Sequence, residues 1–499
     1  MFKRSSGVLA HVTSLPSPHG VGTMGKTACD FIDFLADAHQ TYWQVLPLSQ
    51  TGFGNSPYQS PAAGSLNPYF ISLDELYAEG LLTREELLSA QVPFGYVDYG
   101  RLYRERYPLL KKAFSRFCKS SPAFARFVKK GEFYDYALFM AIKEAHGGAS
   151  FDCWEKPLKY REPSALRDFA KTHGEELLFW QFVQYEAARQ WRAVKAYARE
   201  KNIKIVGDMP IYAAYDSLDV WKNPELFKLD GELRPTAVAG VPPDYFSEEG
   251  QLWGNPVFDY AAHERDGFAW WTARTAGALR NYDYLRIDHF RGLDRYYEIP
   301  AGSPNAKNGR WVDVPHEKLF AALLGKVNKA RVIAEDLGIL DDGVYELLEE
   351  TGFPGMCVLS FAFNGEKDNK YLPEHIEKNS VCYTGTHDND TLVSLLKNMS
   401  AWDKNNFVAG VKNSLKEMNA GGNADTDEAL CDAVIALGFA CKAQLFVLPM
   451  QDAARLGGEY RMNEPSTDKA QNWSVRIEEK YFAERTAEDL RSLAEAYGR

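Results

Sequence analysis

The chain has 499 residues, of which 45% are hydrophobic, so it is long enough for a large core and for more than one minimal domain. Its formal net charge is -11 at pH 7, and because it contains no run of Lys or Arg we expect no nucleic acid partner. No apolar stretch approaches the roughly 20 residues that span a bilayer, so we also expect no membrane association.

Short apolar segments rich in β-branched and aromatic residues recur along the chain and predict β-strands. Amphipathic stretches separate most of them, and this alternation is typical of a parallel sheet. Eight such units fit a (β/α)8 TIM barrel, which we favour over an open doubly wound sheet because eight is the closure number of the common barrel. The predicted strands are 7–15, 42–48, 204–212, 282–290, 331–338, 355–363, 380–388 and 443–450.

Three of the intervening stretches have clear helical patterns. Residues 177–202 predict a long helix that ends just before the third strand, and residues 341–352 begin with acids and end with Gly352, as helices do. The stretch 27–39 predicts a helix with one apolar face, made of Ala28, Phe31, Ile32, Leu35 and Ala38.

Two insertions interrupt the predicted barrel. The interval between the second and third strands is too long for a loop and must have a fold of its own. We therefore expect barrel strands 1 and 2 in 1–48, mainly helical inserted subdomains in 49–203, strand 3 in 204–216, an insertion with a cleft-covering loop in 217–260, and strands 4 to 8 with the C-terminal segment in 261–499.

Carboxylates stand at or near the ends of four predicted strands, at Asp208, Asp288, Glu335 and Asp388. In a barrel the carboxyl ends of the strands converge on one mouth, where active sites lie, so we expect the four side chains to face one pocket. Strand alternation puts Arg286 on the same face as Asp288, and a neighbouring guanidinium should keep that carboxylate ionised.

Several kinds of site contain clustered carboxylates. One is a site for Mg²⁺ or Mn²⁺, another is the carboxylate pair of glycosidic bond chemistry, and a third is a set of structural salt bridges. The aromatic content of 13% favours sugars, although aromatics also fill cores. Arg286 would compete with a metal for Asp288, whereas His387 beside Asp388 leaves a metal possible. Sugar chemistry is the favoured interpretation.

One motif points to a different function. Residues 20–25, GVGTMG, have the G-x-G-x-x-G pattern of a dinucleotide site between a strand and a helix. However, the segment PSPH separates the strand from the glycines, and the second strand lacks the ribose-binding acid that should follow it. We therefore interpret the glycines as shaping a loop over the barrel mouth.

Cysteine usage indicates the compartment. The chain has seven cysteines, none of them in a Cys-x-x-Cys pair, and an odd number is a poor disulfide framework. The first residues, MFKRSSGVLAHVTSLP, contain only a short apolar run and do not form a signal peptide. We expect a protein of the cytoplasm, where thiols stay reduced.

Several long motifs resemble one family. They are RIDHFRGL, AEDLG, THDND, GVPPDYFSEEGQLWGNP, WQVLPLSQTGFGNSPYQS and NWSVRI, and they look like those of the 4-α-glucanotransferases, the amylomaltases or disproportionating enzymes of glycoside hydrolase family 77. The resemblance runs from HVTSLPSPHG to NWSVR, which is almost the whole chain, and it matches the compact form of the family. It implies transfer of α-1,4-glucan segments to an acceptor glucan, with no cofactor and no metal, and it leaves the oligomeric state open.

The resemblance also implies roles for individual residues. Asp288 matches the nucleophile, Glu335 the general acid/base, and Asp388 the third carboxylate, which holds sugar hydroxyls. The matching substrate-binding residues are Tyr58, Asp208, Arg286, His289 and His387 around the reacting sugar, Trp253 and Asn255 on the acceptor side, and Tyr245 and Phe246 in a loop over the cleft. Phe53 stands where some members have tyrosine.

These roles imply a retaining mechanism with a covalent glucosyl-enzyme. We expect Arg286 to lower the pKa of Asp288, and Glu335 to begin protonated so that it can protonate the leaving oxygen. Two alternatives stay open. A hydrolase of the α-amylase type would share the three carboxylates, whereas a non-catalytic glucan-binding barrel would keep the aromatics and lose an acid.

Overall fold

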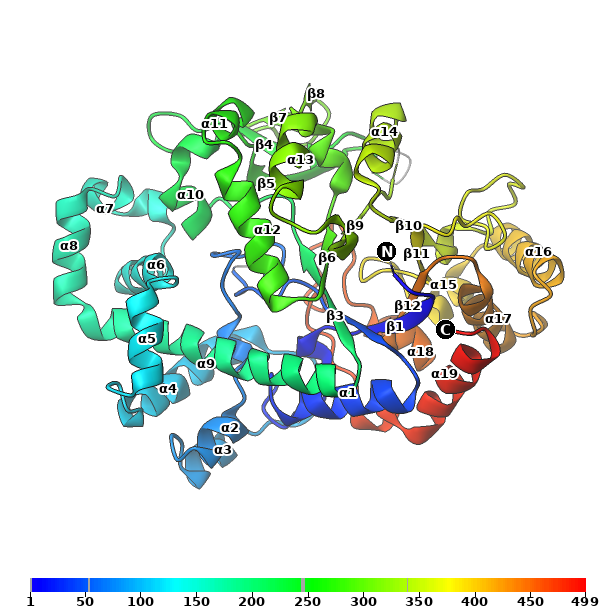
Figure 1. Ribbon diagram of the computed structural model, residues 1–499, viewed down its shortest axis with the longest axis horizontal. Coiled ribbons are helices and arrows are strands. Elements are labelled where there is room, and N and C mark those ends of the chain that lie inside the picture. Colours follow the sequence, from blue (N-terminus) through cyan, green and yellow to red (C-terminus); the bar gives the residue numbers. More distant parts are fainter. Residues whose placement is uncertain (1, 53, 244–246, 339) are drawn as a thin grey trace.

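The protein is built around a ring of parallel strands (Figure 1). The structure, a computed structural model, describes residues 2–52, 54–243, 247–338 and 340–499. Within these ranges eight parallel strands follow the order β10-β11-β12-β1-β2-β3-β6-β9. They are β1 Ser5–Leu9, β2 Tyr42–Gln44, β3 Lys204–Met209, β6 Tyr284–Ile287, β9 Val332–Ala334, β10 Gly355–Val358, β11 Ser380–Tyr383 and β12 Leu445–Pro449.

The two end strands of this order also meet. The backbone N–H of Ala334, in β9, donates to the carbonyl of Pro354, which directly precedes β10, at 3.0 Å. The fold is therefore the predicted (β/α)8 barrel and not an open doubly wound sheet. Seven of the eight segments predicted from β-branched and aromatic residues contain one of these strands, and the first, 7–15, overlaps β1, which begins at Ser5.

Alternation along the strands separates the inside of the barrel from its outside. In β6, Leu285 and Ile287 belong to the large core beneath the helices, whereas Arg286 lies on the opposite face, and its side chain is 5% exposed. A second apolar cluster, which includes Val206 and Tyr383, fills the barrel interior. Arg286 is thus a charged side chain in a mostly apolar interior.

The predicted helices are present. Helix α1 (Lys26–Asp37) buries the predicted apolar face, and α9 (Gly174–Glu200) leads into β3. Helix α14 (Asp342–Thr351) ends at Gly352, whose φ of +68° is the left-handed conformation that glycine adopts most easily at a helix end. The other helices around the barrel are α12 Ala269–Asn281, α13 His316–Leu324, α15 Leu392–Asn398, α16 Ala401–Glu417, α17 Asp427–Ala440, α18 Met450–Ala453 and α19 Glu484–Ala496.

Helices also occupy the long interval between β2 and β3, and they form the left-hand side of Figure 1. α9 is the longest of them, and α6 packs along it. Aromatic side chains are frequent in this packing, for example Phe114 against Phe182 with ring centroids 5.5 Å apart. Before α9 come α2 Leu73–Ala78, α3 Arg84–Ser89, α4 Tyr99–Arg116, α5 Pro122–Lys130, α6 Tyr134–Ala145, α7 Lys156–Lys159 and α8 Pro163–Thr172.

A second, antiparallel sheet lies beside the barrel, with strand order β5-β4-β7-β8 in the described part of the chain. Its strands are β4 Ala237–Val241, β5 Gln251–Pro256, β7 Arg295–Pro300 and β8 Arg310–Asp313, and the short helices α10 Leu218–Lys222 and α11 Tyr260–Arg265 flank it. The sequence pattern assigns all of 261–499 to the barrel and its C-terminal segment. That boundary was wrong for β7 and β8, because β7 pairs with β4 from the preceding insertion.

The glycine motif packs tightly before α1. A side chain at Gly22 would lie 1.8 Å from the carbonyl oxygen of Val12, so this glycine is required by a close backbone approach. Within the described residues, no helix is both long and apolar enough to cross a membrane.

Candidate active site

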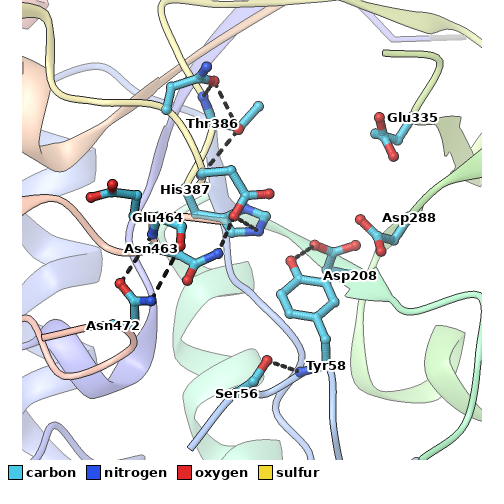
Figure 2. Close-up of polar contacts among 12 residues, drawn as sticks. Ser56, Tyr58, Asp208, Asp288, Glu335, Thr386, His387, Asn463, Glu464 and Asn472 are labelled. Carbon is cyan, nitrogen blue, oxygen red and sulfur yellow. Dashed lines mark hydrogen bonds and ion pairs between the residues drawn. The ribbon is translucent and has the colours of Figure 1, made fainter. Parts of the chain in front are cut away.

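The four predicted carboxylates lie at the carboxyl ends of barrel strands. Asp208 is in β3, Asp288 directly follows β6, Glu335 directly follows β9, and Asp388 stands in the loop after β11. Figure 2 shows Asp208, Asp288 and Glu335 facing the same space, with the tyrosine ring of Tyr58 beside Asp208. Parallel strands that point the same way bring these side chains together although they are far apart in the sequence.

Arg286 connects three of the carboxylates. Its Nη1 atom lies 2.6 Å from Oδ2 of Asp208 and 3.0 Å from Oδ1 of Asp288, and its Nη2 atom lies 3.9 Å from Oε2 of Glu335. A buried guanidinium is costly unless it is paired, and these contacts repay that cost. Because Asp288 and Glu335 contact the two ends of one guanidinium, they are near neighbours, as a retaining carboxylate pair must be.

Arg286 lowers the pKa of Asp288 as expected, but the expected net shift was wrong in sign because burial outweighs this effect. Burial, with a smaller contribution from the neighbouring carboxylates Asp208 and Asp388, raises the pKa of Asp288 to about 7 against the opposing effect of Arg286. Burial likewise raises the pKa of Glu335 to about 8, with Arg286 opposing and Asp288 adding to the rise. The sequence showed the cation but not the depth of burial. Arg286 lies closer to Asp288 than to Glu335, at 3.0 Å against 3.9 Å, and this favours the ionised form of Asp288 over that of Glu335.

Backbone amides hold the carboxylate of Glu335. The N–H of His289 donates to Oε2 at 2.5 Å, and the N–H of Leu337 donates to Oε1 at 3.1 Å. His289 has a φ of 48°, a left-handed conformation that is uncommon for residues with a side chain and begins the short 3-10 helix Phe290–Leu293. This turn aims the amide of His289 at Glu335. It fixes the acid and favours its charged form after it has given up a proton.

Aromatic side chains form a wall beside Asp208. The hydroxyl of Tyr58 donates to Oδ2 of Asp208 at 2.6 Å, and the Tyr58 ring stacks on His387 with centroids 5.2 Å apart. The indole of Trp473 lies against both rings, at 5.6 Å and 5.8 Å. Burial lowers the pKa of His387, so its ring is neutral at pH 7. The wall offers flat apolar faces and hydrogen-bonding edges to a sugar.

The two residues predicted on the acceptor side, Trp253 and Asn255, have different surroundings. Trp253 is partly exposed, and its ring meets that of His289 edge-on with centroids 4.8 Å apart. Burial lowers the pKa of His289 to about 4, so this pair is uncharged at pH 7. Asn255 is 4% exposed, and its amide is bonded to the side chain of Gln59 and to the carbonyl of Ala213. In this structure the amide of Asn255 therefore supports Gln59.

Three residues singled out in the sequence, Phe53, Tyr245 and Phe246, lie outside the described residues. Their predicted roles at the cleft stay predictions.

Two further strand-end acids have structural partners. Oδ1 of Asp336 accepts a hydrogen bond from the N–H of Met356 at 2.6 Å, which ties β9 to β10. Oδ2 of Asp390 accepts a hydrogen bond from the hydroxyl of Ser394 at 2.7 Å, within the first turn of α15. Arg286 contacts Glu335 and not its neighbour Asp336 among the described contacts, so the geometry favours Glu335 as the site residue of this pair.

Residues that sequence reasoning missed stand around Asp388. The side chain of Asn463 donates to Oδ1 of Asp388 at 2.6 Å, and Arg461 donates to the carbonyl of Asp388 at 2.7 Å. Trp473 was noticed only as a letter of the NWSVRI motif, and Gln59 only as part of SPYQS. The motifs could have identified Trp473 and Gln59, because a residue of a family motif that has no assigned role is a candidate for supporting the site.

The carboxylate cluster does not have the arrangement of a metal site. Among the residues that the structure describes, no group of three or more His, Cys, Asp or Glu side chains is placed to hold a metal ion. Arg286 occupies the space between Asp208, Asp288 and Glu335 where a cation would otherwise bind.

Comparison with known proteins decides the family. The family model of glycoside hydrolase family 77, described as 4-alpha-glucanotransferase, matches residues 10–481. The chain belongs to this family. It is 42% identical to the 4-alpha-glucanotransferase of Clostridium butyricum over 98% of this chain and 99% of that protein, and 45% identical to that of Thermus thermophilus over 99% and 98%.

Solved structures agree with this assignment. The amylomaltase from Streptococcus agalactiae in complex with acarbose covers all of both chains with a TM-score of 0.93 and 37% identity. The amylomaltase from Corynebacterium glutamicum is 17% identical and has a TM-score of 0.81 over 99% of this chain and 75% of that one, which shows the shared fold. The family transfers glucan segments through a covalent intermediate, so the predicted enzyme class is confirmed, and the transferase is preferred to the hydrolase and the non-catalytic barrel.

Proposed function

We propose that the pocket around Arg286 is the catalytic centre and that it disproportionates α-1,4-glucans. In this proposal Asp288 is the nucleophile, Glu335 is the general acid/base, and Asp388 holds hydroxyls of the reacting sugar. The observation that carries it is the pair of contacts from one guanidinium to Asp288 and Glu335. The complex of the S. agalactiae amylomaltase with acarbose supports the substrate class.

The first half of the reaction cleaves the donor. The carboxylate of Asp288 attacks C1 of the donor sugar while Glu335 gives its proton to the glycosidic oxygen, so the C1–O bond breaks and the leaving glucan departs with a free 4-hydroxyl. Near neutral pH the proton that the pair retains resides on Glu335, because Arg286 lies closer to Asp288 and stabilises its ionised form. Arg286 stays paired with Asp208 as the negative charge on Asp288 is consumed.

The second half returns the segment to a new acceptor. The 4-hydroxyl of the acceptor gives its proton to Glu335 and attacks C1, which releases Asp288 as a carboxylate and restores an α-bond. The amide N–H groups of His289 and Leu337 stabilise the ionised Glu335 between the two halves. Trp253, beside His289, supplies an apolar face on which the acceptor stacks while water is kept from the intermediate.

The proposal also covers the compartment and the role of the inserted helices. All seven cysteines are free thiols, which supports a reducing compartment such as the cytoplasm. The interval 49–203 is proposed to act as a mainly helical unit that carries Tyr58 to the pocket, where its hydroxyl reaches Asp208.

Incubation with maltotriose tests the function. We expect glucose and a ladder of longer α-1,4-glucans, with total reducing ends nearly constant because each bond broken is remade. Asp288→Asn should lower the rate by about 10⁴-fold or more, which corresponds to roughly 5.5 kcal/mol of transition-state stabilisation. A steady rise of reducing ends without a ladder would show a hydrolase. If the Asp288→Asn variant keeps a tenth of the wild-type rate, Asp288 is not the nucleophile.

A further inference from the structure

A segment near the C-terminus lies against the third carboxylate. Residues 459–474, here called the strap, follow α18 and its loop and return to the barrel mouth beside the loop after β11. Figure 2 shows Asn463 of the strap near His387, and Asn472 joined to Glu464 farther from it. The backbone N–H of Asn463 donates to the carbonyl of His387 at 3.1 Å, so the strap is attached to the backbone that carries Asp388.

Asp388 needs an external support for its carboxylate. Its backbone is held in a turn in which Thr386 and Asn389 bond to each other, and its own N–H donates to the hydroxyl of Thr386 at 3.3 Å. Its side chain, however, is 42% exposed, and His387 approaches it only to 3.5 Å. A short side chain with this much exposure has several rotamers open to it unless a partner selects one.

Asn463 supplies that partner. Its Nδ2 donates to Oδ1 of Asp388 at 2.6 Å, and the residue is 9% exposed. The direction of the amide follows from the chemistry, since its carbonyl oxygen would repel a carboxylate at this distance. One oxygen of Asp388 is thereby fixed, and the other is left to accept hydrogen bonds from sugar hydroxyls.

Arg461 bonds to the backbone of both residues in the Asn463–Asp388 contact. Its guanidinium donates to the carbonyl of Asp388 at 2.7 Å and to the carbonyl of Asn463 at 2.8 Å. The loop after β11 and the strap are therefore joined by three hydrogen bonds around one carboxylate. Charge-assisted and backbone bonds of this kind hold a side chain within the tolerance that a catalytic group requires.

The strap has its own internal support, which is separate from Asp388. The side chain of Asn472 accepts from the N–H of Glu464 at 3.1 Å and donates to carbonyls of Glu464 and Thr467. The strap is also tied to the inserted helices, because the hydroxyl of Tyr99 donates to the carbonyl of Trp473 at 2.8 Å and the N–H of Val97 to that of Ser474 at 2.7 Å. The strap is thus a preformed element and not a loose tail.

We propose that Asn463 is a positioning residue that selects the rotamer of Asp388 in which this carboxylate meets the sugar hydroxyls. The proposal rests on the role proposed above for Asp388. Because these hydroxyl contacts matter most in the transition state, loss of Asn463 should lower kcat more than it raises KM.

A double-mutant cycle tests it. Asn463→Ala, Asp388→Ala and the double variant are assayed with α-maltotriosyl fluoride as donor and maltose as acceptor, so that even weak activities can be measured. Asn463→Ala in the otherwise unchanged protein should lower kcat by about 10- to 100-fold, the range expected when a catalytic group is misplaced. In the Asp388→Ala background the same change should alter kcat by less than about twofold, since the group it positions is gone.

Asn472→Ala is the matched control, because it removes an asparagine of the strap that does not touch Asp388. It should lower thermal stability while kcat stays within about threefold of wild type. Asn463→Ser, which keeps a small polar side chain too short to reach Asp388, replaces Asn463→Ala if the alanine variant does not fold.

Three results would overturn the proposal. The first is that Asn463→Ala lowers kcat by less than threefold. The second is that it lowers kcat as much in the Asp388→Ala background as in the wild type, and the third is that Asn472→Ala lowers kcat as much as Asn463→Ala does. Failure of the underlying role is distinguished by the single variant Asp388→Ala, which would then retain near wild-type activity.

Discussion

Arg286 donates a 2.6 Å hydrogen bond to Asp208 in the interior of the barrel, where the two side chains are 5% and 0% exposed. The positive charge of Arg286 is therefore shared between Asp208 and the catalytic carboxylates. The pKa of Asp288 is raised despite the adjacent guanidinium, and burial is the largest cause. Asp208 contributes as well, because it adds a negative charge that Arg286 does not fully offset.

The wild-type pH profile should reflect both raised carboxyls. Asp288 must be ionised and Glu335 protonated, so kcat/KM should rise with pH through about 7 and fall again through about 8. Initial rates of disproportionation between pH 5 and 10 measure the two limbs. An acidic limb near pH 4, the range of an ordinary aspartate, would contradict the burial argument.

Asp208→Asn should shift the acidic limb to lower pH. The change removes a negative charge near Asp288 and leaves Arg286 free to stabilise the ionised form, so the pKa of Asp288 should fall by about one unit or more. The measurement is the pH dependence of kcat/KM. Asp336→Asn is the control, since Asp336 is also a strand-end acid but its carboxylate bonds to the backbone of Met356. An equal shift in both variants would count against a specific effect of Asp208.

Asp288→Asn should stabilise the fold, and the gain should depend on pH. The folded-state pKa of about 7 lies above the ordinary aspartate value of 3.8, so the folded protein holds the proton more tightly and loses stability as pH rises from about 4 to about 7. Asparagine cannot ionise, so its advantage should be absent near pH 4 and reach the order of 2–4 kcal/mol above pH 7. Thermal melts between pH 4 and 8 measure it. A gain that does not vary with pH would contradict this explanation.

Trp253→Ala should increase hydrolysis relative to transfer. Its ring lies against His289 at the side of the pocket where the acceptor is proposed to stack, and such stacking contributes about 1 kcal/mol. The ratio of glucose release without transfer to ladder formation should rise roughly fivefold. Trp402→Ala serves as the control, because Trp402 is 70% exposed on α16 and does not contact the pocket residues described above. An unchanged ratio would leave Trp253 without the proposed role.

The barrel was predictable because its strands carry their own signal. Segments such as 204–212 and 282–290 are apolar, short and bounded by helices, and their alternation also placed Arg286 inside. β7 and β8 were assigned to the wrong unit because their partner strand is decided by pairing across the chain, which a local pattern does not contain.

The position of the carboxylates was predictable from the sequence, but their pKa values and their supporting residues were not. The carboxylates could be placed together because strand ends converge in a barrel. The raised pKa of Asp288 could not be predicted, because the number of side chains that cover a carboxyl is a property of the packed fold. Asn463 was missed for the same reason, since it lies 75 positions from Asp388 and follows no spacing rule.

The central claim is that Asp288 forms the covalent intermediate, and trapping that intermediate tests it most directly. In Glu335→Gln, α-maltotriosyl fluoride still reacts, because fluoride leaves without a proton, but no base remains to activate the acceptor. A maltotriosyl ester should therefore accumulate, and mass spectrometry of acidic peptic digests should place the added mass on the peptide that contains Asp288. Added mass on the peptide with Asp208 or Asp388, or release of maltotriose at the wild-type rate with no labelled peptide, would contradict the account.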